Sequence, residues 1–141
     1  DPAPAALDAL VIDDEAELTH VYVPLGVGGH VDHIIAREWG IRYALAHRKT
    51  MLLFYEDYPY AEQPHALDNT LGGFRYVLES LSFGVRPLDI DRKIEGIRCY
   101  ESQRSTFWPD WETMARQQRA FMEKRGNGSP RELAWYVVGK R

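Results

Sequence analysis

The pattern of apolar and polar positions predicts a strand, a helix and a second strand in the first half of the chain. Residues 20–25 (HVYVPL) form a β-branched and aromatic run that ends at Pro and Gly, which is typical of a buried strand entering a loop. Residues 31–48 place apolar side chains at helical spacing, and residues 50–57 (TMLLFYED) are again typical of a strand. A strand, a helix and a strand of this length form a βαβ unit, whose two strands lie parallel in one sheet.

The second half of the chain gives a weaker pattern. Residues 71–81 fit a helix or a strand, residues 85–90 (VRPLDI) predict a short strand, and residues 91–107 have helical spacing. Residues 111–124 predict the clearest late helix, which Gly, Asn and Pro residues end between positions 126 and 130. The last stretch, RELAWYVVGK, fits a final strand or an ordered extension. Together these elements predict an α/β fold.

Composition narrows the class of protein. The 141 residues are the length of one domain, and 45% hydrophobic with 27% charged residues is typical of a soluble globular protein. The net charge is −4 and the basic residues are scattered, so nucleic acid is not an expected partner. No apolar run approaches the ~20 residues that span a bilayer, and no secretion signal is recognisable. The single cysteine, Cys99, fits a reducing compartment, so we expect a cytoplasmic protein.

Two unusual loops follow the two predicted parallel strands. GVGGHVDH (residues 26–33) comes after the first strand, and YEDYPY (residues 55–60) comes at the end of the second. Ligands of open parallel sheets bind outside the carboxyl ends of the strands, where such loops gather. We therefore expect the two loops to open on the same edge of the sheet.

The glycines of the first loop allow two interpretations. Gly26, Gly28 and Gly29 permit positive φ angles and precede a helix N-terminus, so they could cradle a phosphate or a nucleotide. Their spacing, however, is neither GxGxxG nor a loop that ends in GK[ST]. The alternative is a tight turn into a buried helix.

The histidines of the same loop are the stronger candidates for chemistry. His30 and His33 are three residues apart at a helix start, where neutral imidazoles can coordinate zinc, and Asp32 is suited to accept the second ring N–H of an imidazole. A capping or buried structural role remains the alternative. A catalytic zinc usually has three protein ligands, and the neighbouring loop offers Glu56 and Asp57 as further candidates.

Three stretches taken together resemble a known family. VYVPLGVGGHVDHIIARE, LLFYEDYPYA and KIEGIRCYESQ, in this order, are similar to the second half of PIG-L/LmbE-type zinc-dependent N-deacetylases. The resemblance implies a Rossmann-like fold with a mostly parallel sheet. It implies a zinc held by a His and an Asp of an N-terminal HPDD motif and by the last His of the later HxDH motif. His33 would then be the metal ligand, His30 would stabilise or protonate the tetrahedral intermediate, and Asp32 would support the site.

The reaction that the resemblance implies is hydrolysis of an acetamido group, commonly on an N-acetylglucosamine-like sugar. No HPDD motif occurs in the chain, and VIDDEAE offers Asp13 and Asp14 without the histidine, which we interpret as a solvated loop. We therefore expect residues 1–141 to be a single α/β domain or the C-terminal half of one. A missing N-terminal segment would complete the site, and the fragment alone would be inactive. The alternative is a non-catalytic binding module on the same scaffold.

Overall fold

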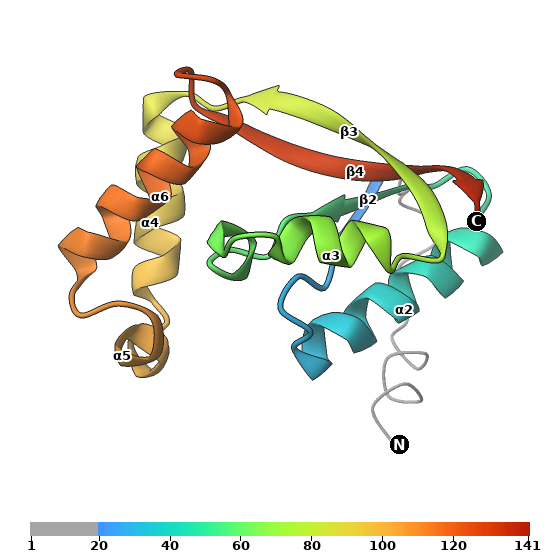
Figure 1. Ribbon diagram of the computed structural model, residues 1–141, viewed down its shortest axis with the longest axis horizontal. Coiled ribbons are helices and arrows are strands. Elements are labelled where there is room, and N and C mark those ends of the chain that lie inside the picture. The colour runs from blue at the N-terminus through green and yellow to red at the C-terminus, as the bar shows by residue number, and fades with distance from the viewer. Residues whose placement is uncertain (1–19) are drawn as a thin grey trace. The chain divides into compact units, whose positions relative to one another are not determined.

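The computed structural model describes residues 20–141 (Figure 1). Asp13 and Asp14, expected in a solvated loop, lie outside the described residues. The elements follow in the order β1 (His20–Pro24), α2 (Val31–Ala46), β2 (Met51–Tyr55), η1 (Tyr60–Glu62), α3 (Ala66–Gly72), β3 (Tyr76–Gly84), α4 (Pro87–Arg98), η2 (Glu101–Gln103), α5 (Arg104–Phe107), α6 (Trp111–Arg125) and β4 (Arg131–Lys140). None of the helices in this part of the chain is long and apolar enough to cross a membrane.

The four strands form one mixed sheet in the order β1-β2-β4-β3. β1 and β2 are parallel from the pair His20 and Met51 to the pair Pro24 and Tyr55, which confirms the predicted βαβ unit. β2 and β4 are antiparallel, and β3 and β4 run in opposite directions (Figure 1). The prediction of a mostly parallel sheet is therefore wrong. The physical reason lies in β3 and β4, which carry charged residues among their apolar ones, as one-sided antiparallel strands do, whereas β2 is a continuous apolar run.

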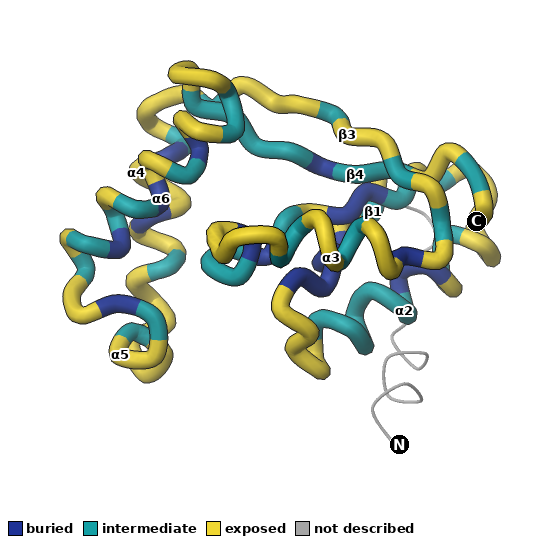
Figure 2. Tube along the Cα trace, in the orientation of Figure 1, coloured by how far each residue is buried: buried dark blue, intermediate teal, exposed yellow. Residues whose placement is uncertain are grey.

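The chain divides into two compact units, and the first holds the βαβ core. It comprises the described residues up to Leu81 together with Ala134–Arg141. Its buried apolar side chains are Val23, Leu25, Val27, Ile41, Leu53, Phe54, Ala61, Phe74 and Ala134. Figure 2 shows buried residues along β1 and beside it. Helix α2 approaches β1 closely at Gly40, where an added Cβ would lie 2.4 Å from Cγ1 of Val23. This contact fixes the helix, and with it the loop that precedes the helix.

The second unit, residues 82–133, is built on the contact between α4 and α6. Its buried side chains on these helices are Ile90, Ile94, Met114, Gln118 and Met122. The strand predicted for residues 85–90 is wrong, because Pro87 begins α4. Proline is favoured in the first helical turn, and it holds the preceding Arg86 in an extended conformation that resembles a strand in sequence. The helix predicted for residues 91–107 ends earlier, at Arg98.

The late helix predicted for residues 111–124 is confirmed as α6, and the last stretch forms β4. The carboxylate of Asp110 accepts the N–H of Thr113 and so caps the N-terminus of α6. At the other end, Gly126 caps the helix, where an added Cβ would lie 1.6 Å from the carbonyl oxygen of Ser129. A residue with a side chain does not fit in this turn, so the glycine ends the helix and directs the chain into β4.

Candidate metal-binding and catalytic site

The loops that follow β1 and β2 are joined by one buried carboxylate. Asp57, two residues after β2, is only 2% exposed, and its Oδ2 accepts the N–H of Gly26 at 2.8 Å and that of Val27 at 2.9 Å. The expectation that both loops open on the same edge of the sheet is therefore confirmed. The parallel pairing of Pro24 with Tyr55 is what brings the loops together, because it ends both strands at the same level.

The glycines form a tight turn against the second loop. Residues 26–29, which we call the glycine loop, contain three glycines with φ angles between 72° and 84°, and the N–H of Gly29 donates to the carbonyl of Gly26 at 3.1 Å. A Cβ added to Gly28 would lie 2.5 Å from the ring of Tyr60. Two of the loop's N–H groups already bind Asp57. The turn thus accounts for the glycines without a phosphate.

Asp57 also fixes the imidazole of His33. Its Oδ1 lies 2.7 Å from Nδ1 of His33, which stands in the first turn of α2 with its side chain 33% exposed. The contact is a close approach and not an aligned hydrogen bond, and an ionised carboxylate, which only accepts, suits the tautomer that has its proton on Nδ1. The lone pair of the imidazole is then on Nε2, and this is the arrangement in which a histidine orients itself toward a metal ion.

The environment of Asp57 opposes and supports its charge at the same time. Burial raises the pKa of the Asp57 carboxyl, while the N–H groups of Val27 and Gly26 and the neighbouring His33 favour the ionised form. Oδ2 is engaged by the two backbone N–H groups, and Oδ1 faces His33, so Asp57 lies where it can support that imidazole. Sequence reasoning considered Asp57 only as a possible ligand, and its place directly after an apolar strand was the signal for a buried role.

His30 lies beside His33 and begins helix α2. It is the N-cap residue, and its Nδ1 accepts the N–H of Asp32 at 3.3 Å. The two imidazole ring centroids are 5.2 Å apart, and the His30 side chain is 45% exposed. Oδ2 of Asp32 lies 3.9 Å from Nδ1 of His30, too far for a hydrogen bond. The structure thus brings the histidines together and places Asp32 at the exposed end.

The residues present fit part of a zinc site. His33 offers an oriented imidazole, whereas the other candidate ligand, Glu56, accepts a hydrogen bond from Nε1 of Trp135 at 3.1 Å. Within residues 20–141 no group of three or more His, Cys, Asp or Glu side chains is arranged to hold a metal ion. The described residues therefore hold one imidazole that could ligate zinc, and they do not hold a complete set of ligands.

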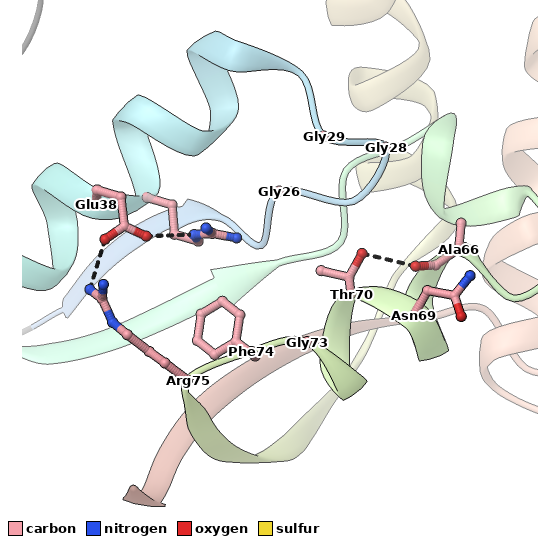
Figure 3. Close-up of a pocket in the computed structure, with 11 residues that line it drawn as sticks. Gly26, Gly28, Gly29, Glu38, Ala66, Asn69, Thr70, Gly73, Phe74 and Arg75 are labelled. Carbon is pink, nitrogen blue, oxygen red and sulfur yellow. Dashed lines mark hydrogen bonds and ion pairs between the residues drawn. The ribbon is translucent and has the colours of Figure 1, made fainter. Parts of the chain in front are cut away.

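A pocket lies along the other side of the glycine loop. Its volume is about 630 Å³, and it is lined by Gly26, Gly28 and Gly29, by side chains of α2 and α3, and by residues 73–75, which lead into β3 (Figure 3). Sites for small molecules have volumes of roughly 300–1,000 Å³. The glycine loop thus forms a wall of this pocket and leads directly into His30.

Comparisons with known proteins agree with the resemblance found in the sequence. No protein-family model matches the chain. A 2'-N-acetylparomamine deacetylase of Streptomyces fradiae is 36% identical over 85 residues, which are 59% of this chain and 30% of that protein. The zinc-inhibited form of teicoplanin deacetylase Orf2 superimposes with a TM-score of 0.72 at 21% identity, over 98% of this chain and 50% of the other.

A deacetylase–teicoplanin complex gives a TM-score of 0.69 at 19% identity, over 99% of this chain and 49% of the other. These structural likenesses establish the fold. The chain spans about half the length of the solved structures and less of the curated relative. Together with the sequence match, they show that the chain is homologous to the PIG-L/LmbE deacetylases over about half of their length.

Proposed function

We propose that this chain is part of a zinc-dependent N-deacetylase that removes an acetyl group from an N-acetylglucosamine-like amino sugar or a related amide. The observation that carries the proposal is the pair formed by His33 and Asp57. An imidazole that is one-third exposed lies 2.7 Å from a buried carboxylate, which can hold it so that its remaining nitrogen binds a metal ion. The sequence identity of 36% over 85 residues to a curated deacetylase supports the same class of reaction.

His33 would hold the zinc through Nε2, and the other ligands would come from a segment of the same protein outside residues 20–141. Zinc, when bound, polarises an amide carbonyl and lowers the pKa of a coordinated water. A carboxylate that accepts the proton of that water is also assigned to the other segment. This division of ligands follows the family resemblance, in which an HPDD motif contributes a His and an Asp.

His30 would act on the leaving amine and on the charge that develops at the amide. It lies beside His33, is accessible to a substrate, and in its protonated form can donate a hydrogen bond or a proton. The carboxylate of Asp32 lies 3.9 Å from Nδ1 of His30, on the exposed side of the site. We therefore assign His30 to acid catalysis and Asp32 to the support of His30.

The test is acetate release from N-acetylated amino sugars by the protein that carries this chain, purified with zinc. We expect turnover that depends on zinc and is lost in His33→Ala. His65→Ala is the matched control, because His65 is an exposed histidine that lies 4.0 Å from Asp68 and is not part of the site. Zinc-loaded protein that releases no acetate from any such sugar would exclude the enzyme function for these substrates.

A non-catalytic binding module is the second candidate, and one observation favours it. Residues 20–141 do not contain a complete set of metal ligands. The coding sequence upstream of this chain separates the two candidates. An HPDD motif in the same reading frame would support the enzyme, and its absence from the complete gene would support the binding module.

A further inference from the structure

The pocket beside the glycine loop has an unbalanced set of charges. The ionisable side chains that line it are Arg37, Glu38 and Arg75. Oε1 of Glu38 accepts from Nε of Arg37 at 3.1 Å, and Oε2 lies 2.7 Å from Nη2 of Arg75 (Figure 3). One carboxylate is therefore shared by two guanidinium groups, and the lining carries a net positive charge.

The two arginines have different roles in this arrangement. Arg37 is 17% exposed, donates from Nη1 to the carbonyl of Leu25 at 3.1 Å, and stacks over the ring of Phe74 with its Cζ 5.0 Å from the centroid. It is held by the wall of the pocket. The side chain of Arg75 is 55% exposed and also lies over the ring of Tyr76, with its Cζ 5.3 Å from the centroid. A guanidinium carries five N–H groups, so Arg75 keeps donors beyond those that face Glu38 and Tyr76. Arg75 is thus the cation that a ligand can reach.

The opposite wall offers neutral polar groups. Asn69 and Thr70 of α3 line the pocket across from Arg75 (Figure 3). The hydroxyl of Thr70 donates to the carbonyl of Ala66 at 2.8 Å, so its oxygen can still accept, and the amide of Asn69 provides both a donor and an acceptor. These are partners for the hydroxyl groups of a sugar. The pocket therefore combines hydroxyl recognition with one accessible cation.

We propose that this pocket binds a carboxylate-bearing, hydroxylated part of the substrate, with the carboxylate on Arg75, and that it disfavours a part bearing an ammonium group. Identifying the ligand as a part of the substrate rests on the N-deacetylase function proposed above. Gly29 lines the pocket and directly precedes His30, so in this proposal the group bound there is part of the molecule whose acetamide reaches the histidines. Charge at a distance from the scissile bond then decides which N-acetylated compounds are accepted.

The test uses three sugars that differ only at the exocyclic carbon: methyl glucuronide, methyl glucoside and methyl 6-amino-6-deoxyglucoside. Titrations are followed by NMR through the amide signals of Gly28, Gly29 and the Asn69 side chain. We expect the glucuronide to bind about fivefold more tightly than the glucoside, which is the size of an exposed charge pair, and the amino sugar to bind more weakly than both. The preference should decrease with added salt.

Two variants that remove charges of opposite sign from the pocket make the test specific. Arg75→Gln should abolish the preference for the glucuronide, while Glu38→Gln should increase it, because each removes one charge of known sign. Arg92→Gln on α4 removes an exposed arginine that lies outside the pocket and should leave the preference unchanged. Equal binding of the three sugars, or a preference that survives in Arg75→Gln, would overturn the proposal.

N-acetylglucosamine and its derivatives with a carboxylate or an aminomethyl group at the exocyclic position separate this proposal from the proposed function, because acetate release can be measured for each of the three compounds. Acetate release with the same order of kcat/KM supports both. Selective binding at the pocket amides without acetate release from any of the three supports a carboxylate site and contradicts the deacetylase. Acetate release at equal kcat/KM for all three supports the deacetylase and overturns the charge selection.

Discussion

Nδ1 of His33 lies 2.7 Å from Oδ1 of Asp57, while Oδ2 of the same carboxylate accepts the N–H groups of Gly26 and Val27. A single buried side chain therefore ties the loop after β1 to the loop after β2 and orients an imidazole of α2. All three segments belong to the βαβ unit, so the local fold by itself is sufficient to build this pair.

Asp57→Asn should reduce zinc affinity about 10–100-fold, the usual effect of losing a carboxylate behind a ligating histidine. An asparagine can still accept the two backbone N–H groups through its oxygen, but its NH₂ group then faces His33. Nδ1 would have to accept instead of donate, and the proton would move to Nε2, the nitrogen needed for the metal. Zinc titration against a competing chelator measures the change, and circular dichroism checks that the variant is folded.

The matched control for Asp57 is Asp32→Asn. Asp32 lies next to the same histidines, but its side chain is 78% exposed and 3.9 Å from Nδ1 of His30. We expect unchanged zinc affinity and a decrease in kcat, because the side chain of Asp32 lies near His30 and not against His33. Equal loss of zinc in the Asp32 and Asp57 variants would contradict the assignment of Asp57 as the residue that positions His33.

His33→Ala and His30→Ala should separate metal binding from turnover. His33→Ala should lower zinc content and activity together, because it removes a ligand. His30→Ala should keep most of the zinc and lower kcat by roughly a hundredfold, the usual size of an acid–base contribution. Metal analysis of the purified variants, together with acetate release, distinguishes the two. Equal zinc loss in both would show that His30 is a ligand as well.

The local sequence pattern was sufficient to predict which loops form the site. The apolar run before Asp57 and the glycines after Leu25 identified two strand ends, and parallel pairing implied that their loops meet. The contact between Asp57 and His33 was not predictable, because it depends on how α2 packs on β1 at Gly40. Neither composition nor spacing specifies which of Asp32, Glu56 and Asp57 faces an imidazole.

The errors in the fold prediction have local causes. Residues 85–90 have the apolar spacing of a strand, but Pro87 starts a helix whose first turn is reinforced by the ion pair of Arg86 and Asp89 at 2.6 Å. The parallel sheet was extrapolated from one βαβ unit. The polar residues of β3 and β4 are the sequence feature that indicates antiparallel strands.

Gly28→Ala and Gly29→Ala form a matched pair that tests the glycine loop. Both residues have positive φ angles, 84° and 72°, but a Cβ on Gly29 meets nothing within 4 Å, whereas one on Gly28 meets Tyr60. Because Cβ of Tyr60 is itself 2.9 Å away, rotation of the ring does not relieve the clash.

Gly29→Ala should lower the free energy of unfolding by about 1 kcal/mol, the cost of a left-handed conformation. Gly28→Ala should cost about 1–3 kcal/mol more because of overpacking. Urea denaturation of the two variants measures the difference. Equal effects would show that the YEDYPY loop can move away from the glycine loop.

The capping carboxylate of Asp110 should make the stability of the fold depend on pH only in the acidic range. The N–H of Thr113 donates to its carboxylate at 2.6 Å, and this hydrogen bond holds the pKa of Asp110 below its ordinary value. A carboxyl whose pKa is lowered by folding stabilises the fold above its unfolded pKa of about 4, and the contribution is lost as the pH falls through the folded pKa. Asp110→Asn retains a capping oxygen that does not titrate.

The free energy of unfolding of the Asn variant should therefore fall less than that of the wild-type protein when the pH is lowered below about 4. Other carboxyls with lowered pKa values, such as that of Asp89, titrate equally in both proteins and cancel in the difference. Asp110→Ala should be less stable than the Asn variant at neutral pH, because it leaves the N–H of Thr113 without its cap. Denaturation at a series of pH values gives all three curves. Parallel curves for the wild-type and Asn proteins would show that Asp110 titrates alike in the folded and unfolded states, and that the cap on α6 does not depend on its charge.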